Sequence, residues 1–468
     1  MPSEGGEEAR TATQAPDRPF GSGSDSKRLL PDEPVADLEA YVASGGGEGL
    51  ATTMRLAPEQ IVAAVRMAGL RGRGGAGFPT GTKWASVVAT AREVASPVYL
   101  VVNGAEGEPG TYKDRTLLTF NPFQVIEGAL IALHAIGAQA AFVGVKERSK
   151  SAERRLTEAL EAVREAGWSG ADRLEMAPGP DEYLFGEEKA MLEVIEGKLP
   201  LPRIMPPYEE GLFATMASPN PTVVNNVETL ANVPGIIAHG PAWFRQAGSD
   251  TSPGTMLFTV VGDVESPGVY ELPLGTPLRT LLVDIAGARD TKAVYSGTSN
   301  PVITPALFDV PLGFDEFAQA SIGLGSGGFI VYDHSHCIVR LLSALSHFLM
   351  IESCGQCPPC KLGTTAITEL LDKIDRGEGV EDDIEAILQR CTTVTDGNRC
   401  YLPVGEQLTI GSTVHAFLDE FSAHLGSPCP STHGALVPKI EHIDHPTGEV
   451  RFDPDYHRKR PDWSYAPS

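Results

Sequence analysis

The chain has 468 residues, enough for about three domains of ordinary size. Hydrophobic residues make up 42% of it and charged residues 21%, values typical of globular proteins that exclude wholesale disorder and a fibrous chain. Acidic residues outnumber basic ones by 61 to 37, which gives a formal net charge of −24. Because phosphate binding needs clustered Lys and Arg, nucleic acid is excluded as an expected partner.

We expect neither direct membrane insertion nor a secretory signal. The most apolar segment, residues 128–145, is interrupted by His134 and Gln139, so a buried helix followed by a short strand describes it better. The first 26 residues are acidic and have no apolar region behind a basic one. Seven cysteines, an odd number in a long chain, do not suggest a disulfide framework. We therefore predict a cytoplasmic protein whose cysteines serve metal or redox chemistry.

The first half of the chain predicts an α/β domain behind an N-terminal extension. Residues 1–54 are rich in Gly, Ser, Pro and Glu and predict a flexible segment. Apolar residues recur at helical spacing over 57–70, and a glycine-dense loop follows at 71–81. Residues 98–104 indicate a buried strand, and helices and strands alternate from there on. This alternation is typical of α/β proteins, and we place the domain at 55–248.

Two smaller domains and a tail are predicted after it. Within 249–333, two strands, a segment of helical period at 276–287 and further strands suggest a small α+β domain of ubiquitin-like size. Within 334–425, four amphipathic segments joined by short links, the last at 405–425, predict a helix bundle. Residues 426–468 are rich in proline and predict an extended tail that covers the surface of the protein or of a partner.

Three cysteines in a C-x2-C-x2-C run, Cys354, Cys357 and Cys360, can bind one inorganic centre from a single tight turn. For the fourth ligand we prefer Cys400, in a loop before a helix, to Cys391, which ends an amphipathic segment where a buried cysteine fits. A tight triplet with a remote fourth cysteine resembles a [4Fe–4S] site. Zinc, which usually takes two separated C-x2-C pairs, and unbound thiols are the alternatives. Structural roles are expected for two cysteines without such spacing, Cys337 and Cys429.

A glycine-rich stretch at 72–77, GRGGAG, formally matches G-x-G-x-x-G. A helix precedes it where the dinucleotide fingerprint requires a strand, and no acidic ribose ligand follows at the expected distance. Its neighbours Arg71, Arg73 and Lys83 are cationic, and glycines allow backbone N–H groups to approach a phosphate. We therefore predict an anion-binding loop, with a plain tight turn as the alternative.

Three further segments are unusually polar beside buried elements: 103–115, 180–197 and 219–234. In the second, Glu187 and Glu188 open a helix, where acidic side chains can simply complement the helix dipole. In the third, Asn225 and Asn226 precede a helix. They can cap it, or they can hydrogen-bond a heteroaromatic ring or a phosphate.

Five motifs in unbroken order resemble one known family. They are GRGGAGFPTGTKW (72–84), NGAEGEPGTYKDR (103–115), YLFGEEKA (183–190), PTVVNNVETLANVP (221–234) and ESCGQCPPCKLGT (352–364). These residues resemble the NADH-oxidising flavoprotein subunit of respiratory complex I and its relatives in NAD-linked hydrogenases and formate dehydrogenases. The resemblance implies a Rossmann-like α/β domain for FMN and NADH, a ubiquitin-like β-grasp (SLBB) domain and a four-helix bundle carrying one [4Fe–4S] cluster.

The resemblance also implies an activity and partners. The family transfers a hydride from NADH to FMN and passes single electrons through the cluster to partner subunits, and ultimately to quinone or another redox module. It usually pairs with a thioredoxin-like [2Fe–2S] subunit, so we expect a place in a redox complex, which could hold the protein at the cytoplasmic face of a membrane. Two alternatives remain: an FMN and [4Fe–4S] electron-transfer subunit that does not use NAD, and a structural paralogue with vestigial cofactors.

Residue by residue, the resemblance implies three sets of ligands. The FMN side comprises Gly72, Arg73, Gly74, Gly75, Gly77, Lys83, Asn103, Tyr183, Gly186, Glu187, Asn225 and Asn226, and Glu106 is counted with the cofactor-binding residues. The nicotinamide nucleotide side comprises Phe78, Glu108, Glu188 and Tyr208. The cluster ligands are Cys354, Cys357, Cys360 and Cys400.

Three positions depart from the family pattern. Ala105 stands where an aspartate is usual near the flavin, Ser86 where a second stacking aromatic is common, and Met205 where a lysine usually meets the nucleotide. Two of the three lie on the NADH side, so we expect NADH binding to be weakened but not lost. Arg203, two residues before Met205, is a candidate to supply the missing charge.

Overall fold

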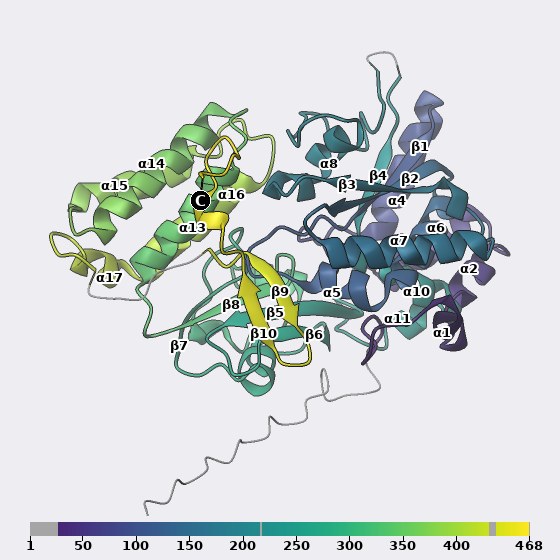
Figure 1. The fold of residues 1–468 in the computed structure, drawn as a ribbon, viewed down its shortest axis with the longest axis horizontal. Helices are drawn as coiled ribbons and strands as arrows, with labels where there is room; N and C mark the ends of the chain where they lie inside the picture. The colour runs from purple at the N-terminus through teal and green to yellow at the C-terminus, as the bar shows by residue number, and fades with distance from the viewer. Residues whose placement is uncertain (1–26, 216–217, 430–436, 468) are drawn as a thin grey trace, which may run out of the picture.

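The computed structural model describes residues 27–215, 218–429 and 437–467. Figure 1 shows an α/β unit beside a helical unit, with a β-rich unit and the C-terminal hairpin between and below them. This arrangement is the predicted fold class. The domain boundaries themselves stay predictions.

The first unit is built on a four-stranded parallel sheet with strand order β3-β2-β1-β4. Its strands are β1 (Val98–Asn103), β2 (Ala138–Lys146), β3 (Leu174–Gly179) and β4 (Thr222–Asn226). Alternate side chains of β1 enter different hydrophobic clusters: Leu100 and Val102 the larger one, Val101 a smaller one. Both faces of the sheet are therefore buried, as is usual for parallel strands.

Helices cover both faces of this sheet. They are α3 (Pro58–Ala68), α4 (Thr80–Val94), α5 (Lys113–Phe120), α6 (Pro122–Ala135), α7 (Lys150–Glu165), α8 (Glu188–Ile195), α9 (Val227–Ala231), α10 (Val233–His239) and α11 (Pro241–Phe244), with short 3-10 turns at Ala171–Arg173 and Tyr183–Gly186. Among the described residues no single helix is long and apolar enough to cross a membrane; α5 and α6 meet the test only as a pair, and the chain bends by 96° between them.

The segment from residue 27 to 54 is folded, so the prediction of a flexible extension is wrong for it. It contains α1 (Leu38–Ala43) and α2 (Glu48–Thr53). The buried carboxylate of Glu271 accepts three successive backbone N–H groups, those of residues 28–30, and buried Glu127 accepts that of Leu50. These carboxylates are distant in the sequence, so composition cannot show that they satisfy the backbone N–H groups of this segment. Residues 1–26 lie outside the described part of the chain.

The second unit has a mixed four-stranded sheet of order β6-β5-β8-β7. Its elements are β5 (Thr255–Gly262), β6 (Gly268–Pro273), β7 (Thr291–Tyr295), a 3-10 turn (Pro305–Leu307), α12 (Phe314–Gln319) and β8 (Gly328–Asp333). β5 runs antiparallel to β6 and parallel to β8. The helix predicted at 276–287 is shorter than expected, a π-helical stretch over Thr280–Ile285 that buries Leu281 and Leu282 in the core of this unit.

The third unit is the predicted helical bundle. Its helices are α13 (Ile338–Glu352), α14 (Pro358–Asp375), α15 (Glu381–Thr393), α16 (Leu402–Ala416) and α17 (Leu418–Ala423). The fourth predicted segment, 405–425, is therefore two helices, because the chain leaves helical geometry at Phe417.

The C-terminal segment is more ordered than an extended tail. β9 (Ile440–Asp444) and β10 (Glu449–Phe452) form an antiparallel hairpin, yellow in Figure 1. The ring of His445, in the turn of this hairpin, meets the edge of Phe120 on α5 with 4.9 Å between centroids. The tail thus covers the protein's own surface.

Farther on, the tail reaches the helical bundle. The Tyr456 hydroxyl and the Lys459 ammonium both donate to one oxygen of Glu352, the last residue of α13, at 2.9 and 2.8 Å. Lys459 and Glu352 are each 1% exposed at the side chain. The tail therefore joins the α/β unit to the bundle through a buried ion pair.

Candidate functional site

The strand order of the α/β sheet reverses between β1 and β4. β1 pairs with β2 on one side and with β4 on the other, and the last residues of β1 and β4, Asn103 and Asn226, lie opposite each other. In open α/β sheets ligands bind outside the carboxyl ends of the strands at such a switch point. The Asn226 amide donates to the Asp114 carboxylate at 2.6 Å, and its oxygen caps α9 by accepting the N–H of Glu228.

The glycine loop lies against this point. A Cβ atom on Gly74 would lie 3.2 Å from the Asn226 side chain, and one on Gly77 would overlap the ring of Phe314. Gly75 and Gly77 have φ values of +125° and +61°, which favour glycine. Gly72 lies in the same loop, where its N–H donates to the carbonyl of Phe78.

Arg73 is the buried cation of the loop. Its side chain is fully buried, and burial lowers the pKa of its guanidinium to about 10. One nitrogen, Nη2, donates to the carbonyl of Pro253, whereas Nε and Nη1 have no hydrogen-bond partner among the described residues. Because a buried cation needs paired donors, these two nitrogens fit an anionic ligand.

Lys83 and its neighbour reach the end of β4 from α4. The Lys83 ammonium donates at 2.9 Å both to the carbonyl of Val224 and to the carboxylate of Glu188. The indole of Trp84 donates to the Asn225 side chain at 2.7 Å. Asn225 is therefore a buried partner of Trp84, whereas Lys83 and Glu188 lie only partly buried at the switch point.

The loop after β1 carries charges that sequence reasoning missed. Lys113 is completely buried and pairs with Asp114 at 2.6 Å and with Glu228 at 2.8 Å. Burial alone would lower the pKa of Lys113, but the carboxylates of Asp114, Glu228 and Glu106 outweigh burial and raise that pKa. Glu106, predicted to bind a cofactor, accepts from the Arg115 guanidinium at 3.0 Å. Lys113 and Glu228 both lie within motifs that resemble the family, at 103–115 and 221–234, and this position was the only indication in the sequence that they belong to the site.

A four-residue turn, Tyr183–Gly186, connects this region to the cysteines. The carbonyl of Gly186 accepts from the Asn103 amide at 2.8 Å, whereas Leu184 lines the cysteine pocket described below. Glu187 follows the turn and caps α8 by accepting two backbone N–H groups. Burial raises the pKa of Glu187 to about 7, against the opposing charge of Lys189.

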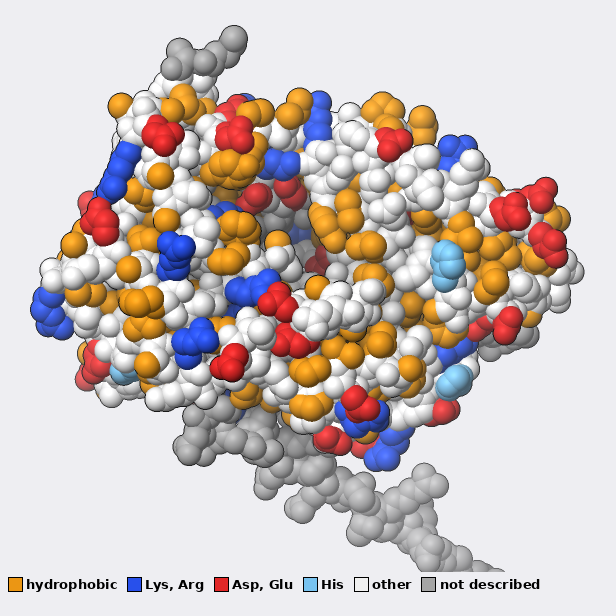
Figure 2. Space-filling view, turned by 180° about the vertical axis from the view of Figure 1, so that it is seen from behind, with side chains coloured by type: hydrophobic (Ala, Val, Ile, Leu, Met, Phe, Trp, Pro, Cys, Tyr) orange, Lys and Arg blue, Asp and Glu red, His pale blue; other side chains and the backbone are white. Residues whose placement is uncertain are grey.

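Two aromatic residues predicted for nucleotide stacking are exposed. Phe78 is 53% and Tyr208 45% exposed, although large aromatic side chains are usually well covered. Figure 2 shows a deep hollow in the face opposite to that of Figure 1, with acidic, basic and hydrophobic side chains around it. Exposed aromatic rings offer stacking surface to a planar ligand.

The structure shows the exposure and the contacts of the three residues that depart from the family pattern. Ala105 is 2% exposed, and Ser86 donates to the carbonyl of Lys83 on its own helix. Met205 is 43% exposed, whereas Arg203 is 8% exposed and pairs with Glu193 at 2.6 Å. Arg203 is therefore not the replacement for the missing lysine, because its guanidinium is held inside the fold.

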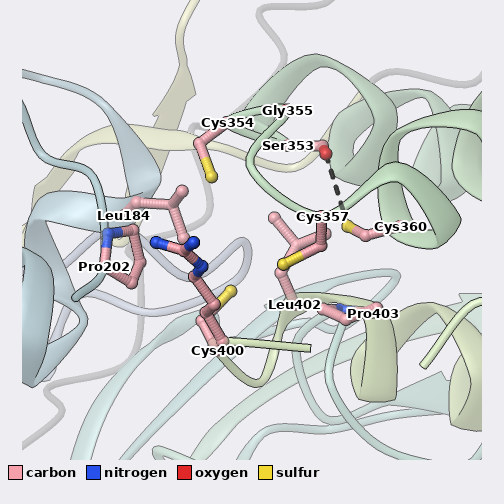
Figure 3. A pocket seen from close by; sticks show the side chains of 11 residues that line it. Leu184, Pro202, Ser353, Cys354, Gly355, Cys357, Cys360, Cys400, Leu402 and Pro403 are labelled. Carbon is pink, nitrogen blue, oxygen red and sulfur yellow. Dashed lines mark hydrogen bonds between the residues drawn. The ribbon is translucent and has the colours of Figure 1, made fainter. Parts of the chain in front are cut away.

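The structure brings the four predicted cluster cysteines around one pocket. Cys354 and Cys357 come from the turn between α13 and α14, Cys360 from the first turn of α14, and Cys400 from the loop before α16. Figure 3 shows their side chains on opposite walls of this pocket, with Leu184, Pro202 and Leu402 between them. Cys391 does not line it and lies buried on α15.

The chemistry of this pocket suits a cluster. Burial raises the pKa of Cys360 to about 11 and that of Cys400 to about 12, so both thiols hold their protons until a metal displaces them. Arg399 also lines the pocket and adds a positive charge beside four prospective thiolates.

Family models match three successive parts of the chain. The Nuo51 FMN-binding domain matches residues 65–235, an SLBB domain matches 257–312, and the NADH-ubiquinone oxidoreductase-F iron-sulfur binding region matches 340–424. An NADH-quinone oxidoreductase subunit of Rhizobium meliloti (strain 1021) is 40% identical over 83% of this chain and 94% of that protein. The chain belongs to this family of NADH-quinone oxidoreductase subunits.

Hydrogenase subunits also match this chain over most of its length. The NADP-reducing hydrogenase subunit HndC of Solidesulfovibrio fructosivorans is 34% identical over 84% of this chain and 82% of that protein. The crystal structure of an NAD+-reducing [NiFe]-hydrogenase in the H2-reduced state matches with a TM-score of 0.74 at 34% identity, covering 84% of this chain and 67% of that one. This chain carries the FMN-binding domain followed by the 4Fe–4S binding region.

Proposed function

We propose that the protein oxidises NADH as one subunit of a multi-subunit redox complex, with a hydride passing to FMN and single electrons leaving through a [4Fe–4S] cluster. Bound FMN accepts two electrons together and releases them singly, which suits a junction between NADH and an iron–sulfur centre. The family membership and the FMN and iron–sulfur models support the activity. The physiological acceptor beyond the cluster depends on the complex.

One observation carries the proposal: a single four-residue turn touches both sites. Gly186 accepts from Asn103 at the switch point, and two residues earlier Leu184 lines the cysteine pocket. A flavin at the carboxyl ends of β1 and β4 would therefore lie close to the four thiols. A short distance between the flavin and the cluster favours direct electron transfer between them, without a conformational change.

The residues divide between the ligands as follows. We assign the FMN phosphate to the glycine loop and Arg73, because two buried guanidinium nitrogens of Arg73 have no hydrogen-bond acceptor among the described residues. Lys83, with its ammonium at the end of β4, supplies a further charge, and Asn103 and Asn226 present polar groups at the switch point. The remaining FMN residues predicted above are part of the same proposal. Glu106 and Asn225 act indirectly, by holding Arg115 and Trp84.

We assign the nicotinamide nucleotide to the exposed side of the same crevice. Phe78 and Tyr208 offer exposed rings for stacking, and Glu188, with its side chain 39% exposed, offers a carboxylate to a ribose. Glu108 belongs to this set by position, but its oxygens already accept hydrogen bonds from the protein. It would therefore shape the nucleotide site more than bind the nucleotide.

We assign the cluster to Cys354, Cys357, Cys360 and Cys400. The seven cysteines leave no second set with cluster spacing, so electrons have to leave through another protein. A thioredoxin-like [2Fe–2S] subunit is the partner we propose, in keeping with the family resemblance. Co-purification of tagged protein from its own cells, followed by mass spectrometry, tests this partner. A location at the cytoplasmic face of a membrane stays a prediction.

Anaerobic mixing of the purified holoprotein with NADH tests the function. We expect rapid bleaching of the flavin absorbance, followed by reduction of the cluster. A flavin that dithionite reduces but NADH does not would favour the alternative, an electron-transfer subunit that works without NAD. A protein purified without flavin or iron would favour the vestigial paralogue.

A further inference from the structure

Two cysteines and a histidine outside both sites lie together at the edge of the helical bundle. Cys337 precedes α13, His424 follows α17, and Cys429 lies in the C-terminal segment, five residues after His424. One ligand atom from each residue lies within 4.8 Å of the other two. The Cys337 sulfur is 3.3 Å from Nε2 of His424. Cys337 is 8% and His424 4% exposed, so the group is largely shielded from solvent.

The imidazole of His424 is already oriented for a ligand. Its Nδ1 lies 2.8 Å from the backbone carbonyl of Glu420. A carbonyl oxygen only accepts hydrogen bonds, so Nδ1 carries the proton and Nε2 presents its lone pair to the two sulfurs. A backbone carbonyl that fixes the tautomer in this way is the usual support of a zinc-binding histidine.

Neighbouring charged groups do not compete for this position. One oxygen of Glu420 accepts the N–H of Ile338 at 2.8 Å, and the other pairs with Lys292 at 2.8 Å. Asp375 pairs with Arg340 at 3.2 Å. The available donors are therefore two sulfurs and one imidazole nitrogen. This soft set suits Zn²⁺ and excludes Mg²⁺ and Ca²⁺, which prefer oxygen.

We propose that Cys337, His424 and Cys429 bind one Zn²⁺ ion. Three protein ligands leave one position of a tetrahedral ion for a water molecule. Two thiolates balance the charge of the ion, and binding releases their two protons to solvent. The site is separate from the [4Fe–4S] pocket, because no cysteine is shared between them.

The proposed ion would link Cys337 to His424, which lies 87 residues later in the chain, and to the nearby Cys429. It would tie the start of α13 and the end of α17 to Cys429 in the tail segment. Farther along, the tail holds the last residue of α13 through the ion pair of Lys459 with Glu352. Zinc would thus anchor the beginning of the C-terminal tail. A later part of the same tail contacts α13, the helix that precedes the cluster cysteines.

Metal analysis of the full-length holoprotein tests the proposal. We expect about one zinc per chain in addition to the iron of the cluster, with X-ray absorption at the zinc edge showing two sulfurs at about 2.3 Å and one nitrogen at about 2.0–2.1 Å. Cys429→Ser and His424→Gln should each lose most of the zinc and keep their flavin and iron. Cys391→Ser, a buried cysteine of the same bundle, is the matched control and should keep all three.

Three results would overturn the proposal. The first is zinc bound by four sulfurs, which would locate it in the cysteine pocket of the cluster. The second is full zinc content in both ligand variants. The third is protein without zinc, even after expression with added zinc, in which peptide mapping finds a Cys337–Cys429 disulfide or two free thiols. The absorption measurement needs no variant, so the test survives if a substitution prevents folding.

Discussion

The carboxylate of Glu108 accepts the phenolic O–H of Tyr183 at 2.5 Å, although the two residues belong to different loops of the α/β unit. Its other oxygen accepts the N–H of Thr298 at 2.6 Å and the hydroxyl of Ser299 at 2.8 Å, both from the loop after β7. A Cβ atom on Gly297 would lie 2.3 Å from this oxygen, so glycine is required for the approach. Glu108 therefore joins the proposed flavin site to the SLBB domain.

Glu108→Gln should destabilise this junction. The amide keeps the shape of the carboxylate but turns one acceptor into a donor that faces other donors, and an unmet buried hydrogen bond costs about 1–3 kcal/mol. We expect a lower thermal midpoint of the holoprotein, followed by flavin release. Ser299→Ala, which removes one donor and leaves the others, should lower the midpoint less. An unchanged midpoint in Glu108→Gln would show that these hydrogen bonds contribute little.

The choice of the fourth cluster ligand can be checked with a pair of variants. Cys400→Ser should abolish the low-temperature EPR signal of the reduced cluster while most flavin remains, because the flavin and cluster sites share only a turn. Cys391→Ser should retain both, since Cys391 lies buried on α15, outside the pocket. The reverse pattern of iron contents would move the fourth ligand to Cys391.

The cysteine pocket could be predicted from sequence because its information is local. Three cysteines lie within one turn, so their spacing alone indicates a shared centre, and only the fourth partner had to be chosen. The group of Cys337, His424 and Cys429 is different. His424 and Cys429 lie only five residues apart, but Cys337 is remote in the sequence, and only the packing of α13 against α17 brings it to them.

Remote hydrogen-bond acceptors explain what sequence analysis missed elsewhere. The composition of residues 27–54 suggested flexibility, but Glu127 and Glu271 order this segment from far away in the chain. Arg203 looked available from its position beside Met205, and only the structure shows its pairing with Glu193. In both cases the partner lies outside the local pattern from which the prediction was made.

The contact of the C-terminal hairpin with α5 should weaken in acid. Burial lowers the pKa of His445 to about 4 from an ordinary value of 6.5. Between pH 6.5 and pH 4 the His445 side chain is protonated when the hairpin is detached and neutral when it is docked. The stabilisation of the docked hairpin is therefore complete above pH 6.5 and is lost as the pH falls toward 4. A shift of this size corresponds to an order of 3 kcal/mol.

Hydrogen exchange of residues 440–452, corrected for intrinsic rates, measures this effect. We expect protection at pH 7 that falls steeply at pH 5 in the unmodified protein and much less in His445→Gln, which cannot be protonated. His415→Gln, at an exposed histidine on α16, should behave like the unmodified protein. Equal loss of protection in all three proteins would assign the acid sensitivity to other groups.

NADH affinity should depend on the charge missing at Met205. Its side chain is 43% exposed, whereas the Arg203 guanidinium is held inside the fold by Glu193 and by the carbonyl of Gly211. Met205→Lys restores a charge that can pair with a phosphate. At about 1 kcal/mol for a partly exposed pair, KM for NADH should fall roughly fivefold.

Steady-state NADH oxidation with ferricyanide as acceptor provides the measurement. Added binding that is equal in the ground and transition states lowers KM and leaves kcat nearly unchanged. Met205→Leu, which changes shape without adding charge, is the matched control and should keep the original KM. The gain from lysine should shrink as ionic strength rises, because salt screens exposed charges. A KM for Met205→Lys equal to that of the leucine variant at low salt would mean that the nucleotide binds away from this segment.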